Sequence, residues 1–267
     1  MLSFPSIDPV AFSVFGLDVR WYGIAYMMGV LLGWRVIMRY QTLSSQPLSA
    51  KLLDAFIPWV LIGIVLGGRL GHVFFYDFDH YMANPFDIPQ TWKGGMSFHG
   101  GLFGVIVATF LFCKKYSLRP FPFFDLLALA TPIGLFFGRI ANFINGELYG
   151  RTTQNPLGMI FPNGGAFPRH PSQLYEAVLE GLVLGLLLLF SYRKLELSKR
   201  EGATSGLFLM GYGMFRFFCE FFREPDTNLG YFLGGTTMGQ WLCIPMILAG
   251  GGLLYVAFRR FKIKNRA

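Results

Sequence analysis

Charged residues are scarce in this chain. Only 14% of its 267 residues are Asp, Glu, Lys or Arg, whereas 53% are hydrophobic. A soluble globular chain normally has about 25% charged residues, so this composition argues against an ordinary soluble domain. The 33 glycines and 30 phenylalanines are typical of helices that pack closely in lipid.

Cysteine is also rare, and no metal-binding pattern accompanies it. Cys113, Cys219 and Cys243 lie inside or at the end of apolar runs, without a CxxC motif or a histidine at ligand spacing. We interpret them as packing residues. Residues 1–20 have neither a basic segment nor a small-residue cleavage pattern, so we expect no cleaved signal peptide.

Long apolar runs predict an all-α integral membrane protein of about seven transmembrane helices. A membrane-spanning helix needs about 20 mostly apolar residues. The candidate spans are 21–38, 53–75, 96–113, 122–140, 174–192, 204–222 and 238–258. Because no repeat or separate soluble domain is evident, we expect residues 1–267 to form a single polytopic domain. The longest gap, 141–173, is predicted to form a small extracytoplasmic cap.

The basic residues predict the orientation of these spans, because cytoplasmic loops of membrane proteins carry an excess of Lys and Arg. With the N-terminus outside, 14 basic residues fall in cytoplasmic segments and 4 in outer segments. The inner set is Arg39, Lys51, Lys114, Lys115, Arg119, Arg193, Lys194, Lys199, Arg200, Arg259, Arg260, Lys262, Lys264 and Arg266, and the outer set is Lys93, Arg151, Arg169 and Arg223. We therefore expect an outside N-terminus and a cytoplasmic C-terminus. This distribution also explains the net charge of +8 without a nucleic-acid partner.

Polar residues at membrane depth gather near one end of the predicted spans. An ionisable residue there costs roughly 2.5–3.5 kcal/mol on insertion scales, so each one is a candidate for function. The spans alternate in direction, yet these residues all fall toward the outside: Tyr22, Arg69, His72, His99, Arg139, Arg216 and Glu220. Snorkelling side chains would be expected at both ends. The distribution predicts a site open to the outer leaflet.

The sixth predicted span carries polar residues on one helical face. Tyr212, Arg216 and Glu220 are spaced i, i+4 and i+8, and Arg223 continues roughly the same stripe. One interpretation is a structural ion pair between Arg216 and Glu220. A guanidinium is also a natural bidentate partner of phosphate, so Arg216 is a candidate for binding an anionic head group, with Glu220 orienting it.

The fourth predicted span ends in the sequence GRIANFINGELYGR, residues 138–151. Arg139 and Asn142 lie about one turn apart, and Asn145-Gly146 is a turn signal. A helix that ends there leaves backbone groups and two asparagines beside a guanidinium, an arrangement suited to lining a polar cavity. The alternative is a helix terminus with an interfacial arginine.

Three further motifs leave alternatives open. His99, followed by two glycines, is either a hydrogen-bonded structural residue or a group that transfers protons. The segment RHPSQLYE, residues 169–176, either forms the polar start of a helix, with Ser172 in a capping role followed by Tyr175 and Glu176, or has a functional role. Arg69 in LGGRLGH either binds a head group or braces the core.

Together these motifs resemble the prolipoprotein diacylglyceryl transferase family. The resemblance rests on HGGL at 99–102, GRIANFINGELYGR at 138–151, RHPSQLYE at 169–176 and SGLFLMGYGMFRFFCEFFREPD at 205–226. RWYG at 20–23, GGR at 67–69 and MGQ at 238–240 are also similar to that family. The motifs cover nearly the whole chain in the expected order.

The resemblance implies a seven-span helical bundle in the bacterial inner membrane, with its active site facing the outer leaflet. The family transfers the diacylglyceryl group of phosphatidylglycerol to the thiol of a lipobox cysteine in a bacterial preprolipoprotein. A thioether forms and glycerol 1-phosphate leaves. The resemblance implies no metal or organic cofactor.

It also implies roles for individual residues. Arg139 and Arg216 would bind the phosphodiester and stabilise the charge that grows as the C–O bond breaks. His99 is the best candidate base for the substrate thiol, although the field of the arginines alone would also favour the thiolate. The expected catalytic residues are Arg139, Arg216 and His99, and the expected lipid-binding residues are Arg139, Tyr22, Asn142, Glu147, Gly150, Tyr212, Glu220 and Arg69.

Two other classes of protein stay open on the residues alone. A transporter or flippase for an anionic lipid would also place arginines in a membrane cavity, but its polar path would continue to the cytoplasmic half. There the predicted spans are nearly uncharged, apart from Asp54 and Asp125 near their ends. A non-catalytic lipid-binding scaffold would not require Tyr, Asn and His around the arginines.

Overall fold

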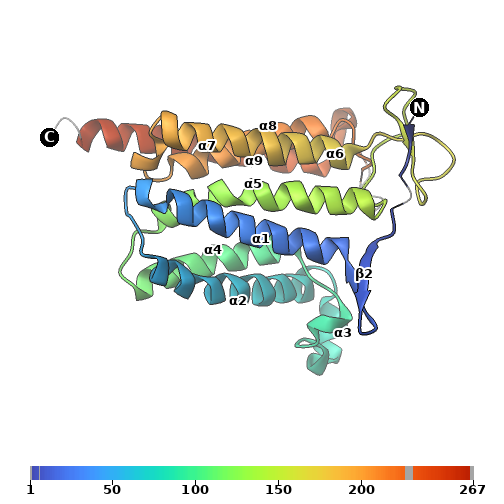
Figure 1. Cartoon of the computed structure of the whole chain (residues 1–267), viewed down its shortest axis with the longest axis horizontal. Coiled ribbons are helices and arrows are strands. Elements are labelled where there is room, and N and C mark those ends of the chain that lie inside the picture. Colours follow the sequence, from blue (N-terminus) through green and yellow to red (C-terminus); the bar gives the residue numbers. More distant parts are fainter. Residues whose placement is uncertain (1, 6, 226–230, 265–267) are drawn as a thin grey trace. The chain divides into compact units, whose positions relative to one another are not determined.

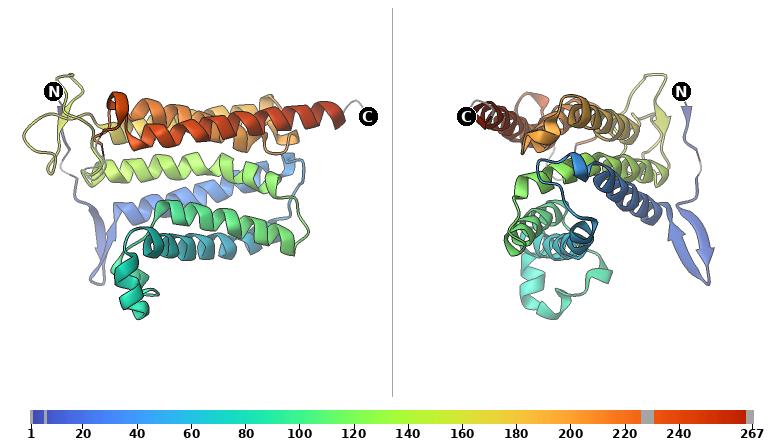
Figure 2. Two further views of the ribbon diagram at one scale, coloured as in Figure 1. Left: turned by 180° about the vertical axis from the view of Figure 1, so that it is seen from behind. Right: turned by 60° about the vertical axis from the view of Figure 1, so that its left-hand side comes forward.

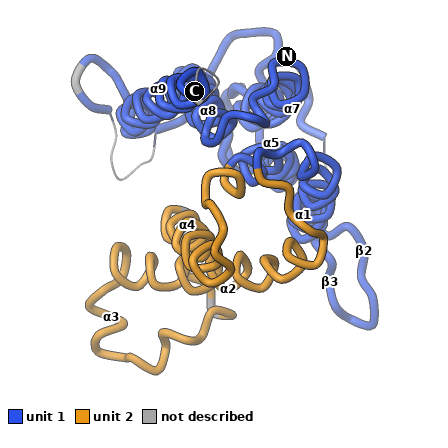
Figure 3. Tube along the Cα trace, turned by 90° about the vertical axis from the view of Figure 1, so that its left-hand side faces the viewer, with its two compact units in different colours: residues 1–45, 125–267 blue, residues 46–124 orange. Residues whose placement is uncertain are grey.

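The chain is predominantly helical in the computed structural model, which describes residues 2–5, 7–225 and 231–264 (Figure 1). It divides into two compact units (Figure 3). The first unit comprises Met1–Ser45 and Asp125–Ala267, and the second comprises Gln46–Phe124. The single domain expected from the sequence stays a prediction.

The first unit contains most of the helices. Its strands and helices are β1 (Leu2–Ser3), β2 (Val10–Val14), β3 (Leu17–Arg20), α1 (Trp21–Tyr40), η1 (Gln41–Leu43), β4 (Met159–Ile160), α6 (Ser172–Glu176), η4 (Ala177–Val183), α7 (Leu184–Lys194), η5 (Leu197–Lys199), α8 (Ala203–Cys219), η6 (Leu233–Gly235) and α9 (Met238–Lys264). Helix α5 (Pro120–Ile144) begins in the second unit and continues through the first. The second unit holds α2 (Ala50–Phe75), α3 (Phe78–Ala83), η2 (Pro85–Asp87), η3 (Thr91–Lys93) and α4 (Phe98–Lys115).

The protein is a multi-pass α-helical membrane protein. Every one of the seven predicted spans coincides with a helix. Within the described residues, five helices are long and apolar enough to cross a membrane: Trp21–Leu43, Ala50–Phe75, Pro120–Ile144, Ser172–Lys194 and Met238–Ile263. The shorter helices α4 and α8, of 18 and 17 residues, match the other two predicted spans but are not among these five.

Helices α2 and α4 lie side by side in the second unit because glycines line their contact (Figure 2). A Cβ atom added at Gly63 would lie 2.7 Å from the carbonyl oxygen of Gly104, and one added at Gly71 would lie 2.7 Å from the Cα of Gly100. Small residues let two backbones approach closely in lipid, where dispersion contacts replace the hydrophobic effect between helices. Glycines also line the contact between α8 and α9 in the first unit, where a Cβ atom at Gly206 would lie 2.8 Å from the carbonyl oxygen of Gly250.

The start of α8 is tied to α5 by a buried carboxylate. Asp125 accepts hydrogen bonds of 2.7 Å from the backbone N–H groups of Gly202 and Ser205 and one of 2.8 Å from the Ser205 hydroxyl. The first N–H groups of a helix lack partners within the helix, and the helix dipole favours a negative charge there. Asp125 therefore fixes α8 against α5, which helps to align the arginines that both helices carry near their other ends.

The segment between α5 and α6 folds onto the N-terminal strand. Strand β1 pairs in parallel with β4, and Phe4 packs against Phe143 and Phe161 at ring-centroid distances of 5.3 and 5.0 Å. Gly146, with φ +66°, lies at the turn that follows α5, in the left-handed region that glycine adopts without strain. The segment predicted as a cap, 141–173, is thus a folded loop region over the ends of α5 and α6. Its location outside the membrane stays a prediction.

Candidate active site

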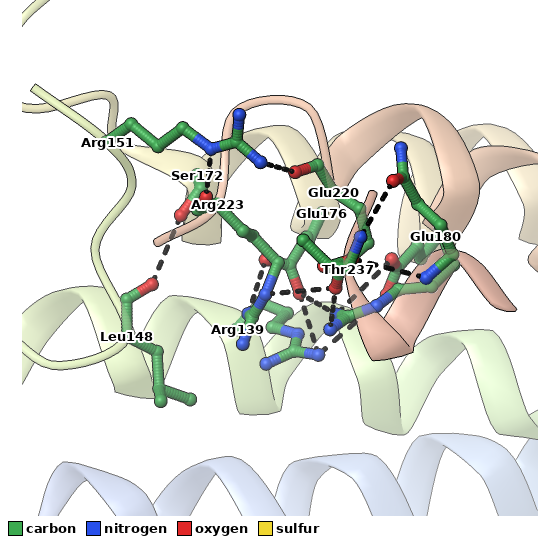
Figure 4. Close-up of polar contacts among 11 residues, drawn as sticks. Arg139, Leu148, Arg151, Ser172, Glu176, Glu180, Glu220, Arg223 and Thr237 are labelled. Atoms are coloured by element: carbon green, nitrogen blue, oxygen red, sulfur yellow. Dashed lines mark hydrogen bonds and ion pairs between the residues drawn. The ribbon is translucent and has the colours of Figure 1, made fainter. Parts of the chain in front are cut away.

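Three arginines and three glutamates form one buried ionic cluster at an end of the first unit (Figure 4). They come from three segments that are distant in sequence. Arg139 lies near the end of α5, Glu176 and Glu180 lie in α6 and η4, and Arg216, Glu220 and Arg223 lie at and beyond the end of α8. The helix ends that carry them meet at the end of the unit where β4 lies, because α6 runs antiparallel to both α5 and α8 (Figure 1).

Glu176 is the centre of this cluster. Its Oε2 atom lies 2.7 Å from Arg139 Nη2 and 2.7 Å from Arg216 Nη1, and its Oε1 atom lies 2.9 Å from Arg223 Nη1. The side chain of Glu176 is fully buried. An ionised carboxylate is stable at such a site only if charge-assisted interactions replace its hydration. Arg216 and Arg223 donate hydrogen bonds to Glu176, and Arg139 adds a third ion pair.

Glu220 is the second anchor of the arginines. Its Oε1 atom lies 2.5 Å from Arg216 Nη2 and 3.3 Å from Arg223 Nε, and its Oε2 atom accepts a 2.7 Å hydrogen bond from the Thr237 hydroxyl. A Cβ atom at Gly239 would lie 2.6 Å from the Glu220 carboxyl carbon, so the start of α9 must approach closely. The ion pair expected between Arg216 and Glu220 is confirmed.

Glu180 differs from the other two carboxylates. It lies in the π-helical segment η4, one wider turn after Glu176, so both side chains face the arginines from one helix. Its nearest atoms lie 4.0 Å from Arg139 Nη2 and 3.9 Å from Arg216 Nη1. Neither carboxylate oxygen accepts a hydrogen bond from any described residue, although the side chain is fully buried. Segments of π-helix often occur at functional sites.

Arg139 is the most open of the three guanidiniums. Its side chain is 18% exposed, and its ion pairs within the described residues use only the Nη2 atom. Arg216, in contrast, engages Nη1 with Glu176 and Nη2 with Glu220. A guanidinium has five N–H donors, so Arg139 retains donors that can bind an anion from outside the chain.

The loop after α5 holds the remaining residues of the 138–151 motif. Asn142, which is buried, donates a 2.8 Å hydrogen bond to Glu147 Oε1, and Gln173 Nε2 donates a 2.6 Å hydrogen bond to the Glu147 carbonyl. Gly150 donates from its backbone to the His170 carbonyl over 2.8 Å, and a Cβ atom at Gly150 would lie 2.9 Å from the His170 Cβ. Gly150 therefore allows two backbone segments to meet close to the arginines. The lipid-binding role expected of these residues stays a prediction.

Two tyrosines predicted for the site lie on separate helices of the first unit. Tyr212 lies on α8, one turn before Arg216, with its ring centroid 5.8 Å from that of Phe208. It is within electrostatic reach of Glu180 and Arg216. Tyr22 lies in the first turn of α1, with its ring centroid 5.1 Å from that of Tyr26.

Arg69 and His99 belong to the second unit. The Arg69 guanidinium donates to the carbonyl oxygens of Asp87, Ile88 and Gly94 at 2.5–2.6 Å and to that of Gly95 at 3.1 Å. These bonds brace the loop between α3 and α4, which is one of the two alternatives that the sequence left open. Lipid binding by Arg69 stays a prediction. His99 lies in the exposed first turn of α4, and its role as a base likewise stays a prediction.

One expectation for the 169–176 motif is wrong. The helix begins at Ser172 as predicted, but its N-cap is Pro171, and no side chain in the described part of the chain caps it. The Ser172 hydroxyl donates instead to the Leu148 carbonyl over 3.1 Å. Glu176 does not bond back to the helix start, because three guanidiniums bind it.

Sequence reasoning missed several residues that shape the site. Glu176 and Glu180 lie four residues apart in an otherwise apolar run, and this spacing indicates two carboxylates on one helical face at membrane depth. Arg151 was counted only as an outer basic residue, yet it donates to the carbonyl oxygens of Arg223 and Glu220 over 2.7 and 3.1 Å and so holds the end of α8. His170 lies in the segment between α5 and α6, where burial lowers the pKa of its imidazole below the ordinary value of 6.5.

The fold and the site thus define a multi-pass membrane protein with a buried cluster of guanidiniums and carboxylates. The chain belongs to the prolipoprotein diacylglyceryl transferase family, a family of transferases whose model matches residues 9–256. Three relatives carry the name phosphatidylglycerol–prolipoprotein diacylglyceryl transferase. The protein from Rhodospirillum rubrum is 52% identical over 98% of this chain and 96% of its own length. Those from Azospirillum brasilense (97% of each chain) and Rickettsia felis (95% of this chain and 98% of its own) are 50% and 49% identical.

Proposed function

We propose that this chain transfers the diacylglyceryl group of phosphatidylglycerol to the lipobox cysteine thiol of a prolipoprotein. The match to the family over nearly the full length carries the proposal. In the reaction, a C–S bond forms at the glycerol carbon that bears the phosphate. The C–O bond breaks, and its electron pair leaves with glycerol 1-phosphate.

The ionic cluster suits this chemistry because the attacked centre is a saturated carbon. No carbonyl oxygen gains charge, so the phosphate is the group whose negative charge grows in the transition state. Arg139, with donors still unused within the described residues, is the group we expect to bind the phosphodiester first. Arg216, held at both terminal nitrogens by carboxylates, would add a positive field in a fixed position. Groups that are fixed before the reaction need no reorganisation when the charge develops.

The nucleophile in this proposal belongs to the protein substrate. Cys113, Cys219 and Cys243 are all buried within the chain. The substrate thiol has an ordinary pKa near 8.5, so it needs a base or a positive field to react at neutral pH. We assign His99 as the base, and we assign Tyr22, Asn142, Glu147, Gly150, Tyr212, Glu220 and Arg69 to positioning the lipid or the arginines.

We further propose seven spans in the bacterial inner membrane, with the N-terminus outside and the C-terminus cytoplasmic. Within the first unit, the cluster gathers where α5 and α8 end. Four basic residues lie near the other ends of these helices: Arg193 and Lys194 in the last turn of α7, and Lys199 and Arg200 between α7 and α8. Because basic segments stay in the cytoplasm, this arrangement supports an active site that faces the outer leaflet. Membrane lipid and the signal peptide of the prolipoprotein would then meet at one depth.

A transfer assay with purified protein tests the function. Phosphatidylglycerol and a lipobox peptide are the substrates, and mass spectrometry detects diacylglyceryl addition. We expect addition to the peptide, and none to a matched peptide with serine in place of cysteine. Folded protein that binds the lipid without transferring it would contradict the proposal and favour the transporter, the alternative that the family match does not support.

A further inference from the structure

Glu180 raises a question of charge balance that the proposed function does not answer. With all side chains ionised, the arginines Arg139, Arg216 and Arg223 balance the glutamates Glu176, Glu180 and Glu220. A phosphodiester adds one negative charge to this cluster. In a medium of low dielectric, an uncompensated charge is costly, so uptake of one proton would restore the balance.

The contacts identify where that proton would reside. Glu176 accepts hydrogen bonds from Arg216 and Arg223 and forms an ion pair with Arg139. Glu220 accepts hydrogen bonds from Arg216 and the Thr237 hydroxyl and forms an ion pair with Arg223. Charge-assisted hydrogen bonds stabilise the ionised form of both. Glu180 accepts no hydrogen bond from the described residues, and its two arginines lie 3.9 and 4.0 Å away. Of the three carboxylates, Glu180 is therefore the one whose protonation costs the least free energy.

The groups that face Glu180 come from each neighbouring element. Arg139 faces it from α5, and Arg216 and Tyr212 face it from α8. Glu176 lies on its own helix, and Arg223 acts on it from beyond α8. An anion that binds Arg139 and Arg216 competes for the two positive charges that hold Glu180 ionised. Anion binding and protonation of Glu180 are therefore coupled in the same direction.

We propose that Glu180 takes up a proton when the anionic lipid binds and donates it to the leaving phosphate. This proposal rests on the proposed function. As the C–O bond breaks, the phosphodiester monoanion becomes a phosphate monoester that would carry two charges. Its second pKa is about 6, so a neutral carboxylic acid beside it can transfer a proton. Glu180 returns to the ionised form, and the proton that the thiol releases to the base balances the reaction.

Proton uptake can be measured without any variant. Detergent-purified protein at about pH 8 in weak buffer is mixed with short-chain phosphatidylglycerol, and an indicator dye reports protons bound. We expect up to one proton per lipid bound, and none with phosphatidylcholine of the same chain length, which carries no net charge. Binding of phosphatidylglycerol without proton uptake would overturn the proposal.

The Glu180→Gln variant assigns the proton to its residue. Glutamine is nearly isosteric with a neutral carboxylic acid but carries no exchangeable acid proton. We expect the variant to bind the lipid without proton uptake and to lose transfer by roughly 100-fold or more. Glu180→Asp should restore both in part. Glu196→Gln serves as the matched control, because Glu196 is exposed and pairs only with Lys199 within the described residues.

Two outcomes separate this proposal from the proposed function. Proton uptake that persists in Glu180→Gln would overturn the assignment of Glu180, even if wild-type protein transfers normally. Failure of wild-type protein to modify the lipobox peptide would instead contradict the function, and it is read in a different assay. A structural role alone would change the unfolding temperature of the variant but not the number of protons bound per lipid.

Discussion

Arg139 and Arg216 meet on one oxygen atom of Glu176. Each guanidinium places a terminal nitrogen 2.7 Å from Oε2, although the two arginines lie 77 positions apart on separate helices. Two positive groups at this separation would repel one another without the carboxylate between them. We propose that the pair is a preformed site for an anion, part of which the Glu176 carboxylate occupies.

The first prediction concerns this anion site. Arg139→Ala should lower transfer by about 100-fold to 1000-fold, because the variant lacks the donors that stabilise the growing phosphate charge. Membrane insertion should be unchanged. The control is Arg259→Ala, which removes an exposed arginine of α9. Initial rates with phosphatidylglycerol and a lipobox peptide provide the measurement, and a normal rate in Arg139→Ala would remove Arg139 from the site.

The second prediction concerns stability. Glu176→Gln leaves three partly buried guanidiniums without their central counter-charge. Breaking a buried ion pair from one side costs about 3–5 kcal/mol, so thermal unfolding in detergent should occur at a clearly lower temperature. Glu224→Gln is the control, because Glu224 is 45% exposed and pairs, among the described residues, with Arg169 alone. Removing such a pair should cost less than about 1 kcal/mol. Equal losses in both variants would contradict the central position of Glu176.

The third prediction tests the base. His99→Gln should lower transfer by about 100-fold and flatten the acidic limb of the pH–rate profile, because glutamine accepts no proton in this range. His80→Gln is the control, since His80 is exposed and pairs with Asp87. A variant that keeps the wild-type pH profile would show that the field of the arginines, and not His99, activates the thiol.

The fourth prediction concerns helix packing in the second unit. A Cβ atom at Gly104 would overlap the carbonyl oxygen of Gly63, whereas one at Gly101 would lie 3.6 Å from the carbonyl oxygen of Ile64, an ordinary van der Waals contact. Both substitutions to alanine raise helix propensity equally. We expect Gly104→Ala to destabilise the protein by about 1–3 kcal/mol and Gly101→Ala to be neutral or slightly stabilising. Unfolding temperatures in one detergent compare the two, and similar values would contradict the close contact of α2 and α4.

The fifth prediction concerns acid stability. Burial lowers the pKa of His170, so the unfolded chain binds a proton at a higher pH than the folded protein does. Stability from this residue is complete above the unfolded pKa of 6.5 and is lost as the pH falls through the lower folded pKa. His170→Gln should therefore weaken the fall in unfolding temperature below about pH 6.5. His80→Gln again serves as the control, and an unchanged slope in His170→Gln would contradict the prediction.

The sequence alone predicted the positions of the helices well. Apolar runs long enough to span lipid leave a helix few alternatives, because every backbone N–H and C=O group must be satisfied within the segment. The ion pair between Arg216 and Glu220 could also be predicted from the sequence, since residues four positions apart lie on one face of a helix. The capping role predicted for Ser172 is wrong. Its hydroxyl donates a hydrogen bond to the carbonyl of Leu148, 24 positions earlier, instead of accepting one from the start of its own helix.

What the sequence by itself determined is local or periodic: helix positions, the excess of basic residues in alternate loops, and the polar stripe on α8. Only the tertiary structure decided that Glu176 joins Arg139, Arg216 and Arg223, and that Glu180 accepts no hydrogen bond from the described residues. The physical reason is that these contacts link residues 37 to 47 positions apart. Spacing along one helix specifies a face, but the packing of several helices specifies which faces meet.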